Sequence, residues 1–165
     1  MAGFKGQAEH SIDAKGRVPV PAKMRPYVDP KARGTFVATR GVEACIVLYP
    51  VTVWEEEFVP RLQELNRHSR KAATLVRSYM MHAEESTMDG QGRVSLPKSL
   101  MELVGLEPGG KAQIVGVMDR IEVWSAEALM AHMDKSRSVM AELEEELMTP
   151  APSSTSRRVF GTRAR

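Results

Sequence analysis

The stretch DAKGRVPVP at residues 13–21 returns as DGQGRVSLP at residues 89–97. Both copies fit the template D-x-x-G-R-V-x-[VL]-P, and they lie 76 residues apart. Asp and Gly within a short polar cluster, followed by alternating apolar residues and a proline, are typical of a tight turn that leads into a strand. Two copies at so long a period indicate a duplicated domain rather than a solenoid of short repeats.

The duplication extends beyond the turn. The segment ACIVLYPVTVWEEE at residues 44–57 aligns with DRIEVWSAEALMAH at residues 119–132, at a spacing of 75 residues. Each half therefore reads as strand, glycine loop, strand, proline, short helix, two strands and a longer helix. We expect the short helices at residues 21–28 and 97–105, where a proline can occupy the first helical position.

Longer helices and a tail complete the organisation. Apolar residues recur at helical spacing over residues 61–83, which predicts a connecting helix between a first unit at 3–60 and a second unit at 84–148. A further apolar stripe predicts a helix at the C-terminal end of the second unit. Residues 149–165 are rich in Pro and Ser and then basic, which is the composition of a disordered extension.

Composition narrows the class of protein. The chain of 165 residues is 42% hydrophobic and 27% charged, as in soluble globular proteins, and its apolar runs fall far short of the roughly 20 residues of a membrane span. The N-terminus lacks the apolar segment of a secretory signal. The single cysteine, Cys45, excludes an internal disulfide, lies in an apolar run that predicts a buried position, and fits a reducing cytoplasm.

Charge is distributed unevenly along the chain. Residues 1–50 carry eight Lys and Arg against four Asp and Glu, although the whole chain has a formal net charge of only +2. A basic segment is a weak indication of a polyanionic partner such as nucleic acid. A solvated basic face without a partner explains the same count equally well.

Sequence motifs of catalysis and metal binding are absent. The sequence has no phosphate-binding loop, no dinucleotide fingerprint and no nucleophile elbow. Its histidines are scattered without the spacing of metal ligands; they are His10, His68, His82 and His132. The sequence therefore predicts a protein that is not an enzyme and that binds no cofactor or metal.

The repeated turn has two interpretations. In the structural one, Asp13 and Arg17 face each other across the turn, and the Asp side chain accepts backbone hydrogen bonds that stabilise it. This explains Asp, Gly and Pro, but a turn needs neither Lys15 nor Arg17. In the functional one, these two cations are presented to a phosphate or to a guanine edge, which Arg can contact through two acceptors at once. Asp13 would then hold the guanidinium group in position.

The paired D-x-x-x-R motifs, together with LYP at residues 48–50 and EVWS at residues 122–125, resemble the MraZ family over about residues 3–147. These are bacterial transcriptional regulators built from two tandem SpoVT/AbrB-type units. The resemblance implies an α+β fold in which the two units pair within one chain as a pseudo-dimer, each adding a swapped hairpin to a β-barrel surrounded by helices.

The resemblance also implies a function. It predicts a ring-shaped homo-oligomer that binds double-stranded DNA at short direct repeats in a promoter, in the cytoplasm and in association with the nucleoid. The regulated genes would be a cell-division and cell-wall cluster that includes the protein's own gene, and regulation would be repression. No membrane partner is expected.

The DNA-binding residues carry over one by one from the resemblance. Asp13, Lys15 and Arg17 match the first motif, and Asp89 and Arg93 match the second.

One position separates the two copies. Gln91 stands where Lys15 stands in the first loop, and residues 86–125 carry four basic against five acidic side chains. We therefore expect the first loop to make most of the DNA contact and the second to serve mainly as its structural partner. The alternative function is an AbrB-type, antitoxin-like module that binds another protein, for which the C-terminal tail would be the ligand.

Overall fold

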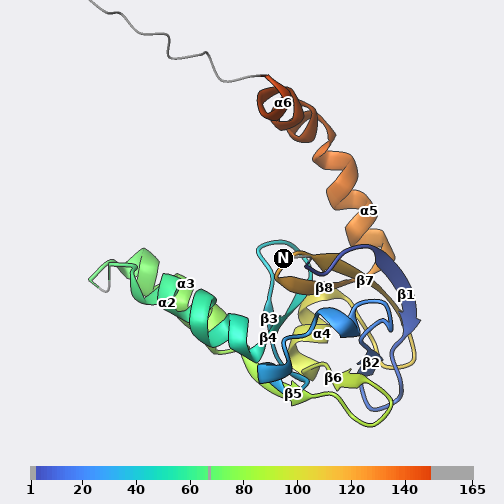
Figure 1. Cartoon of the computed structure of the whole chain (residues 1–165). Helices are drawn as coiled ribbons and strands as arrows, with labels where there is room; N and C mark the ends of the chain where they lie inside the picture. The colour runs from blue at the N-terminus through green and yellow to red at the C-terminus, as the bar shows by residue number, and fades with distance from the viewer. Residues whose placement is uncertain (1–2, 67, 150–165) are drawn as a thin grey trace, which may run out of the picture. The chain divides into compact units, whose positions relative to one another are not determined.

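The computed structural model describes residues 3–66 and 68–149 and divides the chain into two compact units, Met1–His132 and Met133–Arg165. The first unit holds the β-strands of the described residues, and helices complete both units (Figure 1). The predicted α+β class is confirmed. Among the described helices, none has the length and hydropathy needed to cross a lipid bilayer.

The strands form a large and a small antiparallel sheet. The described strands are β1 (Gln7–Ser11), β2 (Arg17–Pro19), β3 (Thr35–Arg40), β4 (Ile46–Pro50), β5 (Glu84–Thr87), β6 (Arg93–Ser95), β7 (Lys111–Val117) and β8 (Arg120–Trp124). Six of them form a sheet in the order β1-β7-β8-β4-β3-β5, and β2 pairs with β6 alone. The strands expected from the alternating apolar pattern are therefore present in both halves.

The two sequence halves exchange strands. Strand β1 of the first half pairs with β7 of the second, with Ala8 opposite Ile114. Strand β5 of the second half pairs with β3 of the first, with Phe36 opposite Ser86. Neither half can complete its own sheet, so the packing that stabilises one half depends on the other.

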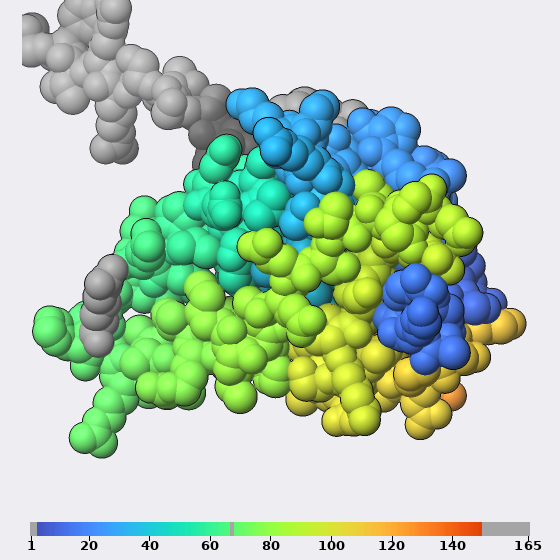
Figure 2. Space-filling model, turned by 90° about the horizontal axis from the view of Figure 1, so that it is seen from below, coloured from blue at the N-terminus to red at the C-terminus, as the bar shows by residue number. Residues whose placement is uncertain are grey.

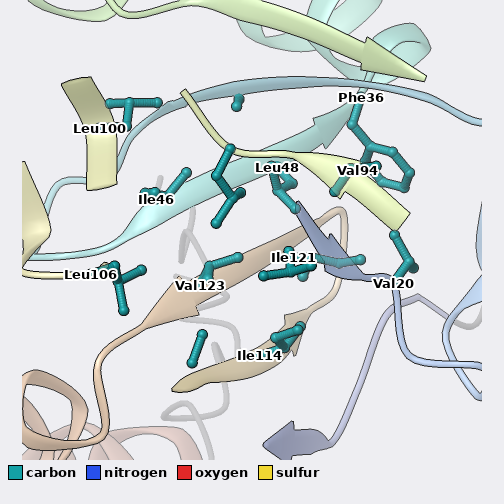
Figure 3. Close-up of a cluster of buried hydrophobic side chains, with 14 of the residues drawn as sticks. Val20, Phe36, Ile46, Leu48, Val94, Leu100, Leu106, Ile114, Ile121 and Val123 are labelled. Atoms are coloured by element: carbon teal, nitrogen blue, oxygen red, sulfur yellow. The ribbon is translucent and has the colours of Figure 1, made fainter. Parts of the chain in front are cut away.

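The main core lies between the large sheet and the small one and draws on both halves (Figure 3). Phe36, Ile46 and Leu48 of the first half and Ile114 and Ile121 of the second are almost fully buried. Burial of each such side chain stabilises the fold by about 1.5–3 kcal/mol. The shared core therefore fixes the position of the small sheet, which carries the two repeated turns.

The opposite face of the large sheet packs a second apolar cluster. Side chains alternate between the two faces of a strand, so Val47 and Tyr49 of β4 point away from the main core and pack with Trp54 and Trp124. Cys45 is buried in this cluster, as predicted. Burial raises the pKa of its thiol to about 12, so the thiol stays protonated at neutral pH.

The helices match the sequence only in part. Their bounds are α1 (Val51–Val53), a π-helical segment (Trp54–Phe58), α2 (Val59–Gln63), α3 (Arg70–Met80), α4 (Lys98–Val104), α5 (Ala126–Lys135) and α6 (Arg137–Met148). Helix α4 is the short helix expected at residues 97–105, and it ends at Gly105 with φ of 72°. The helix expected at residues 21–28 is wrong, because only a 3-10 turn at Arg25–Tyr27 forms. Pro26 in its centre lacks the amide hydrogen that a helix would need.

Two longer helices are each broken. The single helix expected over residues 61–83 is wrong, since α2 ends at Gln63 and Ser69 starts α3 by accepting a hydrogen bond from the Ala72 amide. The C-terminal helix is likewise divided at Ser136 into α5 and α6. The tail predicted from residue 149 lies outside the described residues beyond Thr149.

Helices α2 and α3 together line an apolar groove of about 430 Å³. Its walls include Leu62, Ala72, Val76 and Met80, which are members of the apolar stripe that predicted helix here, and Val59, which precedes that stripe. Part of that stripe therefore faces a surface groove rather than the core of the sheet.

Candidate nucleic-acid interface

The first repeated turn is built around the Asp13 carboxylate. Its Oδ1 accepts hydrogen bonds from the backbone N–H groups of Lys15 and Arg17, at 3.0 and 2.8 Å. The Gly16 amide donates to the Asp13 carbonyl at 3.0 Å, and Gly16 has φ of 77°. Only glycine adopts this conformation without steric cost, which explains the sequence D-x-x-G-R.

The second turn repeats this geometry. The Asp89 Oδ1 accepts from the backbone N–H groups of Gln91 and Arg93, at 2.9 and 3.0 Å. The Gly92 amide donates to the Asp89 carbonyl at 2.9 Å, and its φ is 74°. The structural interpretation of the repeated motif is therefore confirmed for Asp and Gly in both copies.

Each turn also holds its own arginine. Arg17 Nε donates to Asp13 Oδ2 at 2.7 Å, and Arg93 Nε donates to Asp89 Oδ2 at 2.9 Å. Each carboxylate therefore uses one oxygen for the backbone of the turn and the other for the guanidinium group. The expected contact between Asp13 and Arg17 is therefore present, and Asp89 makes the same contact with Arg93 in the second copy.

The two turns are tied to each other through the same four side chains. Arg17 Nη1 lies 3.7 Å from Asp89 Oδ2, and Arg93 Nη1 lies 3.6 Å from Asp13 Oδ2. We call Asp13, Arg17, Asp89 and Arg93 the ion-pair cluster. Sequence reasoning missed these cross-loop contacts, because only the pairing of β2 with β6 brings the loops together.

Strand pairing fixes the distance between the loops. Val18 stands opposite Val94 at the centre of the small sheet, and both side chains are buried in the main core. The Leu96 amide donates to the Gly16 carbonyl at 2.8 Å, and the equivalent bond joins Val20 to Gly92 at 2.9 Å. From below, dark-blue atoms of the N-terminal region lie beside yellow-green atoms of the second half (Figure 2). The two loops therefore form one continuous surface.

The electrostatics favour charged carboxylates in the cluster. Backbone hydrogen bonds from Arg17 and Arg93, followed by the side-chain bonds and charges of these arginines, hold the pKa of Asp13 and of Asp89 below the ordinary value of 3.8. The two aspartates and two arginines sum to zero charge at neutral pH. Lys15, which is exposed, adds a positive charge to the first loop.

The arrangement can present donors to an anion. The four side chains of the cluster are 27–31% exposed, so the cluster lies at the surface. The cross-loop distances exceed that of a hydrogen bond, so the hydrogens on Nη1 of Arg17 and Arg93 are available to an external acceptor. Arg17 itself lies at the base of the turn rather than at its apex, where Lys15 stands.

One further cation lies against the second loop. Arg25 Nε donates to the Val20 carbonyl at 2.8 Å, and its Nη2 donates to the Gln91 carbonyl at 3.3 Å. No sequence signal pointed to this residue, because it lies 66 residues from Gln91 along the chain. The five predicted site residues all lie on the two adjacent loops, with Arg25 beside them.

Comparisons with known proteins agree with the duplication. A family profile described as "MraZ protein, putative antitoxin-like" matches residues 4–78 and again residues 79–149. The chain is 36% identical over 148 residues to the "Transcriptional regulator MraZ" of Natranaerobius thermophilus, an alignment that covers 88% of this chain and 96% of that protein. Identity to the protein of the same name from Halothermothrix orenii is 35% over 140 residues, covering 85% and 93%.

A solved structure is more distant. It is titled "The solution structure of PHS018 from pyrococcus horikoshii" and is 16% identical, covering 76% of this chain and 98% of that one. Its TM-score of 0.34 is too low to establish a shared fold.

Proposed function

The chain belongs to the MraZ family, and on this premise we propose that it regulates transcription by binding DNA sequence-specifically through its two paired loops. The observation that carries the proposal is the ion-pair cluster, which holds Arg17 and Arg93 at the surface of one compact unit. Cations fixed in advance lose little conformational entropy when they bind, so more of the interaction energy contributes to affinity.

The residues of the loops have different roles in this proposal. Lys15 is exposed and contacts the phosphate backbone, which gives affinity without sequence information. Arg17 and Arg93 reach a base edge or a phosphate, and guanine is the base that an arginine reads best. Asp13 and Asp89 do not touch DNA but keep the guanidinium groups oriented.

The strand exchange supports the finer description of the fold. Strands β1 and β5 each pair with the opposite half, which is the arrangement of a pseudo-dimer with swapped hairpins around a barrel. Two loops related in this way present similar groups at a fixed spacing. A protein of this kind suits a DNA site made of repeated short words.

Assembly into a ring would extend this repetition. Several copies on several direct repeats gain avidity without any new contact.

We assign the contact between copies to α6 of one copy in the α2–α3 groove of the next. The charges are complementary, because the basic residues of α3 are Arg70, Lys71 and Arg77 and the acidic residues of α6 are Glu142, Glu144, Glu145 and Glu146. Helix α6 also exposes Val139, Leu143 and Leu147.

Family membership supports the proposed target. The regulated site would be the promoter of a cell-division and cell-wall gene cluster that includes the protein's own gene, and binding there would repress transcription. The protein would accordingly act in the cytoplasm, on the nucleoid. A footprint of the purified protein on the DNA upstream of its own gene tests this directly. Protection of regularly spaced short words is expected, and uniform weak protection would contradict it.

The description of the matching family as antitoxin-like keeps one alternative open to experiment. In that alternative the chain binds a protein partner through residues 150–165. Deletion of this segment leaves DNA binding intact under our proposal. Loss of a partner from the deleted protein, with no DNA bound by the full chain, would favour the alternative.

A further inference from the structure

Arg25 lies against the second loop, although it belongs to the first half of the chain. Its Nε donates to the Val20 carbonyl at 2.8 Å and its Nη2 to the Gln91 carbonyl at 3.3 Å. A Cβ built on Gly92 would overlap the guanidinium carbon of Arg25, with Nε and Nη2 both 2.6 Å away. The guanidinium group therefore covers the glycine of the second turn and lies beside its apex.

The equivalent place at the first loop is occupied by a different residue. Met101 is 76 residues beyond Arg25, the spacing of the two motifs, and its side chain lies against Gly16. A Cβ built on Gly16 would be 2.9 Å from Met101 Cε. The same position is therefore filled by an apolar side chain at the first loop and by a cation at the second.

The distribution of charge around the loops is reciprocal. The first loop has Lys15 at its apex and Met101 against its glycine. The second loop has Gln91 at its apex and Arg25 against its glycine. Each loop thus has one cation in addition to the neutral ion-pair cluster. In the first loop this cation is Lys15, which belongs to the loop itself. At the second loop it is Arg25, which comes from the first half of the chain.

We propose that Arg25 is the DNA-contacting cation of the second loop, taking the place that Lys15 has in the first. This inference rests on the proposed function. It replaces the expectation that the second loop is mainly a structural partner, which came from counting charges along the sequence. Arg25 is an exposed residue whose head is anchored on Val20, so it can hold a phosphate without first losing much freedom.

The test replaces Arg25 by methionine, the residue type that occupies the equivalent position 101 at the first loop. Arg25→Met removes the positive charge, and methionine is a side chain that already packs on the turn glycine of the first loop. Arg25→Met/Gln91→Lys then restores a cation in the manner of the first loop. Arg61→Met on α2 removes one exposed positive charge elsewhere and is the matched control. Arg25→Lys provides a second variant that keeps the charge.

Binding is measured on DNA from upstream of the gene at several salt concentrations, with assembly checked by size-exclusion chromatography. Arg25→Met is expected to weaken binding by about tenfold, the order expected for one charge-assisted hydrogen bond. It should also flatten the salt dependence by about 0.9 in log–log slope for each phosphate that the variant no longer neutralises. Gln91→Lys in the same chain should restore both, and Arg61→Met and Arg25→Lys should leave the slope as in the parent protein.

Each other outcome has a defined meaning. Unchanged affinity and slope in assembled Arg25→Met would overturn the inference while leaving the proposed function intact. Weakened binding that Gln91→Lys does not restore would show that Arg25 supports the shape of the loop rather than DNA contact. An assembled parent protein that binds no DNA would contradict the proposed function itself, and the inference with it.

Discussion

Arg17 Nη1 lies 3.7 Å from Asp89 Oδ2, across a separation of 72 residues in the sequence. The same arginine donates through Nε to Asp13 at 2.7 Å. One guanidinium group therefore links two carboxylates from the two halves of a duplicated chain. Duplication within one chain places both loops in a single compact unit, so their spacing does not depend on the association of two subunits.

Replacement of this arginine should weaken specific DNA binding. In Arg17→Ala the donors to the base edge or phosphate are lost, and a bidentate arginine contact is worth about 1–3 kcal/mol, or roughly five- to 150-fold in affinity. A gel shift on the upstream DNA measures the loss, and size-exclusion chromatography must show an intact oligomer. Retention of full affinity by an assembled Arg17→Ala protein would refute the assignment of this residue.

Replacement of Asp13, the carboxylate partner of Arg17, separates the effect of net charge on DNA binding from the effect of orienting the guanidinium group. Asp13→Asn makes the loop more positive, so charge alone would strengthen binding. We expect weaker specific binding, because the amide presents hydrogens to Arg17 Nε and releases the guanidinium from its position. Glu57→Gln on the π-helical segment removes the same charge elsewhere and serves as the control. Tighter specific binding by Asp13→Asn would show that orientation by Asp13 has no part in recognition.

The sequence predicted the local parts of this site well. Asp13, Gly16 and Arg17 form one turn, and every contact among them spans at most four residues, so the motif alone contains the information. The contacts that join the loops depend instead on the pairing of Val18 with Val94. The shared core determines which strands pair across such a long sequence separation, and no local sequence pattern predicts that pairing.

The same limit explains what was missed elsewhere. Arg25 was counted with the basic first half, but the pairing of β2 with β6 places it against the second loop. The single helix expected over residues 61–83 was wrong. The helical spacing of apolar residues continues across the break between α2 and α3, although Ser69 caps the start of a new helix there. The periodicity of apolar residues predicts which face of a helix is apolar, but it does not predict where one helix ends and the chain reverses direction.

The glycines of the turns provide a test of backbone geometry. Gly92→Ala should lower the free energy of unfolding by about 1–2 kcal/mol, because φ of 74° disfavours a side chain and the added Cβ would overlap Arg25. Gly90→Ala in the same loop is the control, since a Cβ there meets nothing within 4 Å. Urea denaturation measures both, and equal losses at the two positions would contradict this account of the turn.

The proposed contact between copies predicts a change in mass. Leu143→Ser/Leu147→Ser removes exposed apolar groups from α6 and should lower the oligomer mass measured by light scattering, since less apolar area is buried between copies. Salt should weaken the parent assembly as well, because opposite charges of α3 and α6 are screened. Glu127→Gln on α5 is the control. An unchanged mass in the serine variant would exclude α6 as the contact.

The ion-pair cluster predicts a stability that is lost only in acid. The pKa values of Asp13 and Asp89 are held below 3.8, first by backbone hydrogen bonds from Arg17 and Arg93. The folded state therefore releases these protons more readily than the unfolded chain. The resulting stability is fully present above about pH 5 and is lost as the pH falls through 3.8 and then through the lower folded-state pKa.

The matched variant for this test is Asp13→Asn/Asp89→Asn, which cannot release these protons. The difference in unfolding free energy between the parent protein and this variant should be constant above about pH 5 and should shrink below pH 3.8. Urea denaturation across this range measures it, and carboxyl-carbon NMR titration reports the two pKa values directly. A difference that grows between about pH 5 and 8 would assign the effect to another group. Titration of either aspartate above 3.8 would show that the arginines do not hold the carboxylates in their charged form.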